Sequence, residues 1–307
     1  MSLMVVGTVA FDALETPYGK RDKIIGGSAT YFSLAATFFT GQANLVAVVG
    51  DDFEQSDIDM MEKRGINTEG LQIKEGQKSF FWSGRYHADM NTRDTLITDL
   101  NVLAEFDPQI PDTFQDCEYL MLGNLTPMVQ MQVLERLKHR PKLVVMDTMN
   151  FWMESALDDL KKVLTKVDVL SINDEEARQL ADDYSLVKAA RKIMAMGPKM
   201  LIIKKGEHGA LLFHQDQAFF APALPLEEVF DPTGAGDSFA GGFLGYLAAT
   251  KDTSFENMKR AVIHGSAIAS FCVEKFGPER LVELTKPELH ERIQEFIDLV
   301  QFDIELD

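Results

Sequence analysis

The chain alternates strand-like apolar runs with helical stretches along most of its length, and this alternation limits the folds open to it. The run LVAVVG within Asn44–Gly50 is continuously apolar, which is typical of a strand buried on both faces. Leu143–Asp147 and Asp168–Ile172 are further strand-like runs, each followed by a helical stretch. Because helical crossovers join parallel strands, the pattern predicts an α/β fold, a three-layer α/β/α domain with a mostly parallel central sheet. The chain has 307 residues, 46% of them hydrophobic, which suits a single domain over residues 1–307.

One segment interrupts the alternation. Residues 70–100 contain short β-type runs separated by turn residues, with polar and apolar positions mixed. Such a segment predicts antiparallel strands with one face in solvent. We expect it to form a small β-strand lid together with residues 12–26. The mixed character of this face also leaves a homodimer through the lid open.

Composition narrows the range of partners. The formal net charge of −18 opposes binding to nucleic acid and to anionic membranes. No run approaches the roughly 18 apolar residues of a membrane span, and Cys117 and Cys272 show no metal-binding spacing. These features predict a reduced, cytoplasmic protein that binds a small molecule. Any phosphate ligand must therefore be held by backbone amides, a metal ion or a few basic side chains.

The segment Phe230–Phe243 reads FDPTGAGDSFAGGF and carries the strongest chemical signal. Glycines let the amides of a turn converge on one point, and the helix that follows begins with unpaired N–H groups and a partial positive charge. Gly234, Ala235 and Gly236 are thus predicted to form an anion hole without basic side chains. Asp237 would face the same point and could accept the proton of an attacking hydroxyl. Taken alone, the same residues also fit a tight turn followed by a helix-capping acid.

Two other phosphate motifs are excluded. The sequence contains no GxxxxGK[ST], so it is not a P-loop enzyme. GAGDSF lacks the third glycine of GxGxxG and stands late in the chain, which argues against an NAD-dependent oxidoreductase.

The segment DPTGAGDSFAGGF resembles the C-terminal signature of the ribokinase-like carbohydrate kinases (PfkB type), DTxGAGD followed by SFxxGF. The resemblance implies that Asp237 is the catalytic base and that Gly234 to Gly236 form the anion hole. It implies ATP and Mg²⁺ as cofactors, and it places Asp231 and Thr233 in a loop that binds a monovalent cation such as K⁺ in the family. It also implies the ribokinase-like fold with its lid.

A second stretch, GGSATYFSLAA, resembles the early GGxxxN signature of that family, with Tyr31 where the asparagine usually stands. Asp12 matches the substrate-binding aspartate after the first strand, and Asn124 follows another strand-like run. The implied acceptor-binding residues are Asp12, Gly26, Gly27, Tyr31 and Asn124. The tyrosine favours the divergent sugar, polyol or nucleoside branch of the family over ribokinase itself.

The nucleotide side is marked by three weaker likenesses. Asn173 and Glu176 match the NxxE element, which supports Mg²⁺ mostly through water, although the same residues also suit a helix cap. IKKGEHG resembles the nucleotide segment, with Lys204 replacing the usual threonine, and His264 stands near an adenine-side asparagine. A solvated strand-end lysine and a core histidine are the simpler alternatives. The implied nucleotide-binding residues are Asn173, Lys204, Gly206, Gly209 and His264.

The sequence therefore predicts transfer of the γ-phosphate of ATP to a hydroxyl of a sugar or related small alcohol. A nucleoside kinase and a non-catalytic nucleotide- or metabolite-binding homologue are the alternatives. In the lid, Trp82, Tyr86 and His87 would either stack on the substrate or pack between two protomers. Arg85 and Arg93 would either reach a phosphate or be solvated at the surface.

Overall fold

The computed structural model describes residues 2–301, in which the strands form two separate sheets. The larger sheet has nine strands within this range. They are β1 (Leu3–Val6), β4 (Ala43–Gly50), β5 (Ile66–Lys74), β8 (Tyr119–Leu122), β9 (Leu143–Met146), β10 (Val169–Asn173), β11 (Met200–Lys204), β12 (Ala210–His214) and β13 (Gln217–Ala221). Their order is β13-β12-β11-β10-β9-β8-β1-β4-β5, parallel from β11 to β5, with β12 and β13 joined on antiparallel.

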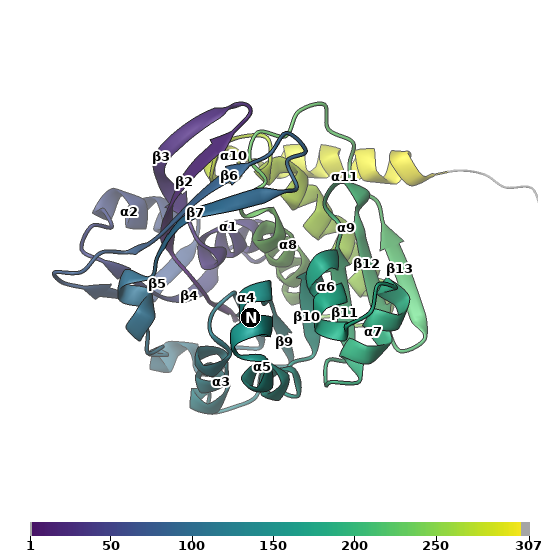
Figure 1. Cartoon of the computed structure of the whole chain (residues 1–307), viewed down its shortest axis with the longest axis horizontal. Coiled ribbons are helices and arrows are strands. Elements are labelled where there is room, and N and C mark those ends of the chain that lie inside the picture. Colours follow the sequence, from purple (N-terminus) through teal and green to yellow (C-terminus); the bar gives the residue numbers. More distant parts are fainter. Residues whose placement is uncertain (1, 302–307) are drawn as a thin grey trace, which may run out of the picture.

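Helices cover both faces of this sheet (Figure 1). They are α1 (Ser28–Thr40), α2 (Gln55–Lys63), α3 (Pro127–Arg136), α4 (Asn150–Ser155), α5 (Leu157–Leu164), α6 (Asp174–Ala181), α7 (Leu186–Met194), α8 (Ala235–Thr250), α9 (Phe255–Cys272), α10 (Glu279–Glu283) and α11 (Lys286–Val300). Neighbouring strand residues point to opposite faces, so Val5 packs into the core under α1, α8 and α9, and Val6 into the core under α3, α5, α6 and α7. The predicted three-layer α/β/α fold is thereby confirmed.

Helix α8 packs closely against its neighbours because glycines stand at the contacts. A Cβ atom at Gly241 would lie 2.3 Å from the Phe32 carbonyl oxygen of α1, and one at Gly242 would lie 2.9 Å from the Cα of Gly265 in α9. Each glycine within a helix costs about 1 kcal/mol relative to alanine. This close packing accounts for that cost, and it holds the N-terminus of α8 in a defined position.

The second sheet contains β3 (Gly19–Gly26), β2 (Ala10–Thr16), β6 (Phe80–Tyr86) and β7 (Arg93–Asp99), in that order. It projects from the edge of the main domain, as Figure 1 shows at the upper left. β2 pairs in parallel with β6, whereas β2–β3 and β6–β7 are antiparallel. We call this four-stranded sheet the lid.

The lid differs from the expectation in two respects. Residues 70–74 belong to β5, which pairs in parallel with β4 at the edge of the main sheet. One lid pair, β2–β6, is parallel where antiparallel strands were expected. The reason is that an edge strand of either sheet has one exposed face, so polar and apolar residues alternate in both. Within residues 2–301, no helix is long and apolar enough to cross a membrane.

Candidate active site

The turn before α8 presents free amide groups. Gly234 has φ of 76°, the left-handed conformation that favours glycine, and it is the N-cap of the helix. Within residues 2–301, the amides of Gly234, Gly236 and Asp237 donate no hydrogen bond, whereas the amide of Ala235 donates to the Pro232 carbonyl at 3.2 Å. The turn therefore offers a group of donors to an anion, and the Ala235 amide, expected in the anion hole, is already engaged.

Lys204 lies directly at this turn. A Cβ atom at Gly236 would be 2.9 Å from the Lys204 Nζ, and the lysine side chain is only 17% exposed. The N-terminus of a helix is its positive end, so an ammonium group there is unfavourable unless negative charge is added. A buried lysine at this place, beside unpaired amides, is the arrangement expected of an anion site.

Three carboxylates surround the Lys204 ammonium. Asp147 Oδ2 lies 3.7 Å from Nζ, and burial opposes the charge of Lys204, but Asp147, Glu176 and Asp237 outweigh it and raise its pKa. Burial, reinforced by repulsion from Asp147, raises the pKa of Asp237 to about 7 and that of Glu176 to about 7. Burial also raises the pKa of Asp147. One lysine is thus shared among three acids, and the group as a whole is short of positive charge.

This shortage suits Mg²⁺, which prefers oxygen ligands and keeps several of its waters. Among residues 2–301 no group of three or more His, Cys, Asp or Glu side chains could hold a metal by itself. Glu176 forms a capping box with Asn173, whose Oδ1 accepts from the Glu176 amide at 2.8 Å, while Glu176 Oε2 accepts from the Asn173 amide at 2.8 Å. Asp147 and Glu176 can therefore receive a hydrated ion that ATP also binds, and the pair fits the metal in that way.

Asp12 lies in the lid and faces the same site. It is 4% exposed, and a Cβ atom at Gly26 would lie 1.9 Å from its Oδ2, so only glycine leaves room for this carboxylate. Burial, with repulsion from Asp231 and Asp237, raises the pKa of Asp12 to about 8. Within residues 2–301 the Asp12 carboxylate accepts no hydrogen bond. Its acceptor capacity is thus open to a ligand hydroxyl.

Gly27 has φ of 96° and is the N-cap of α1, where a Cβ atom would lie 2.4 Å from the Thr8 carbonyl oxygen. Tyr31, in the first turn of α1, is 1% exposed, and a Cβ atom at Gly234 would lie 2.4 Å from three of its ring carbons. The Tyr31 ring therefore supports the turn from below. Its hydroxyl is buried without a hydrogen-bond partner in the described part of the chain.

The Asp231 side chain is fully buried and organises the loop before the turn. Its Oδ1 accepts from the Thr233 amide at 2.9 Å, and its Oδ2 accepts from the Gly277 amide at 2.8 Å. The Thr233 hydroxyl in turn donates to the Tyr86 hydroxyl of the lid at 3.1 Å. The lid is thus hydrogen-bonded to the loop that leads into α8.

The turn between β6 and β7 also reaches the predicted nucleotide segment. Gly206 has φ of 54°, and a Cβ atom there would lie 2.7 Å from Asn91 Oδ1. Gly209 has φ of 80°, with the Ala221 carbonyl oxygen 2.1 Å from where its Cβ would be. Both glycines are therefore needed for the path of this segment beneath the lid.

Two predicted residues are engaged elsewhere. Asn124 follows β8, where its Oδ1 accepts from Trp152 Nε1 at 3.0 Å and its Nδ2 contacts the sulfur of Met149. The His264 ring stacks on Tyr246 with centroids 4.0 Å apart and meets Phe39 edge-on, and burial lowers its pKa to about 4. These contacts match the simpler alternative of a packed, neutral histidine.

The sequence left two contributors unassigned. Asp147 was recognisable only as an acid that follows a strand, and its pairing with Lys204 depends on β9, β10 and β11 lying side by side. Arg93 lies at the start of β7, where its charge lowers the pKa values of Asp237 and Glu176. Arg85 instead pairs with Glu15 within the lid, with Nε 3.0 Å from Oε1.

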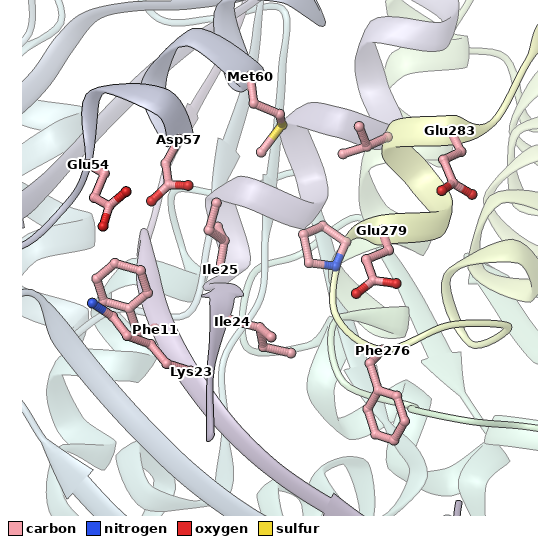
Figure 2. A pocket seen from close by; sticks show the side chains of 12 residues that line it. Phe11, Lys23, Ile24, Ile25, Glu54, Asp57, Met60, Phe276, Glu279 and Glu283 are labelled. Atoms are coloured by element: carbon pink, nitrogen blue, oxygen red, sulfur yellow. The ribbon is translucent and has the colours of Figure 1, made fainter. Parts of the chain in front are cut away.

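A cavity of about 520 Å³ lies on the opposite face of the lid (Figure 2). Phe11, the strand neighbour of Asp12, lines it together with Lys23, while α2 contributes Asp57 and α10 contributes Glu279 and Glu283. Because Phe11 and Asp12 point to opposite faces of β2, this cavity is separate from the group around Asp237.

The comparisons with known proteins agree on one family. Residues 2–284 match the pfkB family carbohydrate kinase profile. A cytidine kinase of Thermococcus kodakarensis is 30% identical over 250 residues, which cover 80% of this chain and 87% of that protein.

Two solved structures share the fold. The nucleoside kinase of Burkholderia thailandensis in complex with inosine superposes with a TM-score of 0.74 at 20% identity, covering 97% of this chain and 99% of that one. The nucleoside kinase of Methanocaldococcus jannaschii, an archaeal member of the ribokinase family, gives a TM-score of 0.76 at 21% identity, covering 96% and 99%. The ribokinase-like fold expected from the sequence is confirmed.

Proposed function

Because the chain belongs to the pfkB family of carbohydrate kinases, we propose that it transfers the γ-phosphate of ATP to a nucleoside at the N-terminus of α8. Membership makes it a phosphotransferase that acts on a hydroxyl group of a sugar or nucleoside, and it implies the use of ATP and Mg²⁺. The choice of a nucleoside is supported by the 30% identity to a cytidine kinase over most of the chain.

The observation that carries the proposal is the ammonium of Lys204 beside the unpaired amides at the start of α8. Without an anion, two positive features of the molecule face each other there. A γ-phosphoryl group would accept hydrogen bonds from both, and it would lie beside Asp237, the first-turn acid of the same helix.

The chemistry follows from this arrangement. Asp237 accepts the proton of the acceptor hydroxyl as the oxygen bonds to the γ-phosphorus and the bond from phosphorus to the bridging β–γ oxygen breaks, which releases ADP. The amides of Gly234 and Gly236 and the Lys204 ammonium stabilise the charge on the transferred group. Mg²⁺, held at Asp147 and Glu176 through water, would neutralise the phosphates of ATP.

On the acceptor side, Asp12 would accept a hydrogen bond from a ribose hydroxyl, because its buried carboxylate has no partner within residues 2–301. Gly26 leaves the room that this carboxylate needs. The lid, hydrogen-bonded through Tyr86 to Thr233, would keep water from the reacting groups. Asn173, Gly206 and Gly209 stay predicted nucleotide contacts, as Gly27, Tyr31 and Asn124 stay predicted acceptor contacts.

Three further expectations belong to the proposal. A monovalent cation such as K⁺ would bind near Asp231 and Thr233, supported by the full burial of that carboxylate. A homodimer through the lid is supported by β7, an edge strand exposed along its whole length. A cytoplasmic location is supported by two free cysteines, Cys117 and Cys272.

The test is ADP release from ATP·Mg²⁺ over a panel of nucleosides, pentoses, hexoses and inositols, with and without K⁺. We expect nucleosides, cytidine among them, to stimulate release most. Asp237→Asn should lower kcat by about 10²- to 10⁴-fold, the usual contribution of a general base, while ATP binding by calorimetry is retained.

Asp158→Asn is the matched control, because Asp158 is an exposed acid in the first turn of α5 and should leave the rate unchanged. Rates near wild type in Asp237→Asn would remove this residue from the mechanism. A folded protein that releases ADP with no acceptor would instead favour the non-catalytic binding protein.

A further inference from the structure

We propose that the indole of Trp82 is the platform on which the base of the acceptor stacks, so that this lid residue determines preference for a nucleoside over a free sugar. The inference deepens the proposed function and rests on its nucleoside acceptor. It is carried by the orientation of Trp82, by how its ring is held, and by the engagement of the other aromatic side chains nearby.

Trp82 faces the catalytic group. In the parallel pair β2–β6 it stands in register with Asp12, and side chains in register on adjacent strands point to the same face of a sheet. Tyr86, four residues on and therefore on that face too, reaches Thr233 in the loop before α8. Phe11 and Phe81, the neighbours of Asp12 and Trp82, are paired in register on the opposite face.

The Trp82 ring lies flat on the lid because the residue two positions along is glycine. A Cβ atom at Gly84 would lie 2.2 Å from Cη2 and 2.5 Å from Cζ2 of the indole, so any larger residue would displace the ring. The indole Nε1 donates to Thr95 Oγ1 at 3.4 Å, which orients the ring along the sheet. One face of the half-buried ring is therefore covered by the lid backbone and the ring is held in place before a ligand arrives.

The other aromatic side chains named for this role are engaged. Tyr86 is 7% exposed and accepts a hydrogen bond from Thr233. His87 lies in the exposed turn after β6, where its Nε2 is 3.0 Å from Asp94 Oδ2. Tyr31 lies under Gly234. Of these four aromatic residues, Trp82 is the one that combines a held ring with the face shared by Asp12.

A base gains from such a ring and a free sugar does not. Stacking of one base on an aromatic side chain changes affinity by roughly 5- to 150-fold. A pentose has no planar face and would use Asp12 alone. Trp82 therefore adds to the binding of nucleosides selectively, and it does so whichever base is present, because every base has a π-face.

The experiment compares Trp82→Leu, which keeps apolar contact but removes the planar ring, with Trp82→Phe, which keeps a smaller ring. We expect Trp82→Leu to raise KM for a nucleoside about 10- to 100-fold, with KM for ATP and any turnover of ribose unchanged, and Trp82→Phe to recover part of the loss. His87→Ala is the control on the same lid and should leave all constants unchanged.

A binding measurement separates this inference from the proposed function. The chain has two tryptophans, so Trp152→Phe leaves Trp82 as the single fluorophore. Nucleosides should quench its emission and ribose should not. An unchanged nucleoside KM in Trp82→Leu, or unquenched emission while nucleosides are phosphorylated, would overturn the stacking and leave the function standing. Quenching by nucleosides that are not phosphorylated would support the stacking and refute the nucleoside acceptor, and neither quenching nor turnover would refute both.

Discussion

Replacing Lys204 by methionine tests how the charge at the start of α8 is used. Methionine keeps the length and apolar part of the side chain, but it removes the ammonium that lies beside Gly236. Asp147, Glu176 and Asp237 then lose the cation that lowers their pKa values. The variant should change stability, rate and pH dependence together, and each change has its own magnitude.

The stability change follows from the pair with Asp147. At 3.7 Å and an effective dielectric constant of about 20, two unit charges attract by about 4–5 kcal/mol. Removing one partner of a buried pair costs about 3–5 kcal/mol, whereas removing both costs far less because no charge is left unpaired. Lys204→Met should therefore destabilise the protein, and Lys204→Met/Asp147→Asn should recover most of that loss.

The rate should not recover in the double variant. Loss of one group that stabilises transition-state charge lowers kcat by about 10²- to 10³-fold. Lys204 lowers the pKa of Asp237, which burial holds at about 7, so its removal raises that pKa further. Asp237 acts as a base only when ionised, and the fall in kcat/KM on the acid side should therefore begin at a higher pH than in wild type.

Urea unfolding measures the stability term, and ADP release between pH 5.5 and 9 measures the other two. Lys205→Met is the matched control, because Lys205 is the adjacent lysine and forms no ion pair within residues 2–301. An acid limb at the wild-type pH in Lys204→Met, or a loss of rate no greater than in Lys205→Met, would refute the placement of the ammonium at the transferred phosphoryl group.

Two more predictions address the same turn. Because the pKa of Asp237 is raised to about 7 and the base is ionised above it, wild-type kcat/KM should rise through pH 7 and fall about tenfold per unit well below it; a flat profile from pH 5.5 to 8 would contradict this assignment. Gly234→Ala should cost more free energy of unfolding than Gly76→Ala: both have left-handed φ, 76° and 71°, worth about 1–2 kcal/mol, but only Gly234 would drive its Cβ to 2.4 Å from the Tyr31 ring, whereas Gly76 has nothing within 4 Å. Urea unfolding gives the difference, expected at about 1–3 kcal/mol, and equal losses would show that the Tyr31 contact is soft.

Features that depend on contiguous residues were predictable from the sequence. The free amides and the acid at the start of α8 come from four successive residues, 234–237, whose conformations are locally determined. The three layers followed from the alternation of strands and helices. In both cases the structural consequence depends on neighbours in the chain.

Features that depend on the packing of distant segments were not predictable. Whether residues 70–74 join the lid or the main sheet depends on which edge they meet, and their alternating pattern suits either. His264 lies on a helix, and the rotation of α9 decides whether it faces a ligand or Tyr246. The partnership of Lys204 with Asp147 requires three strands in order.

The buried acids around Lys204 also set the terms on which this protein can be made more heat-tolerant. Asp12, Glu176 and Asp237 have raised pKa values in the folded state, so the folded chain loses stability as pH rises toward neutrality, most of all when nothing cationic fills the site. A selection for thermal tolerance carried out on the empty protein would reward their neutral replacements first. Such a selection would enrich inactive chains, whereas the same selection with nucleotide and magnesium present would retain the acids.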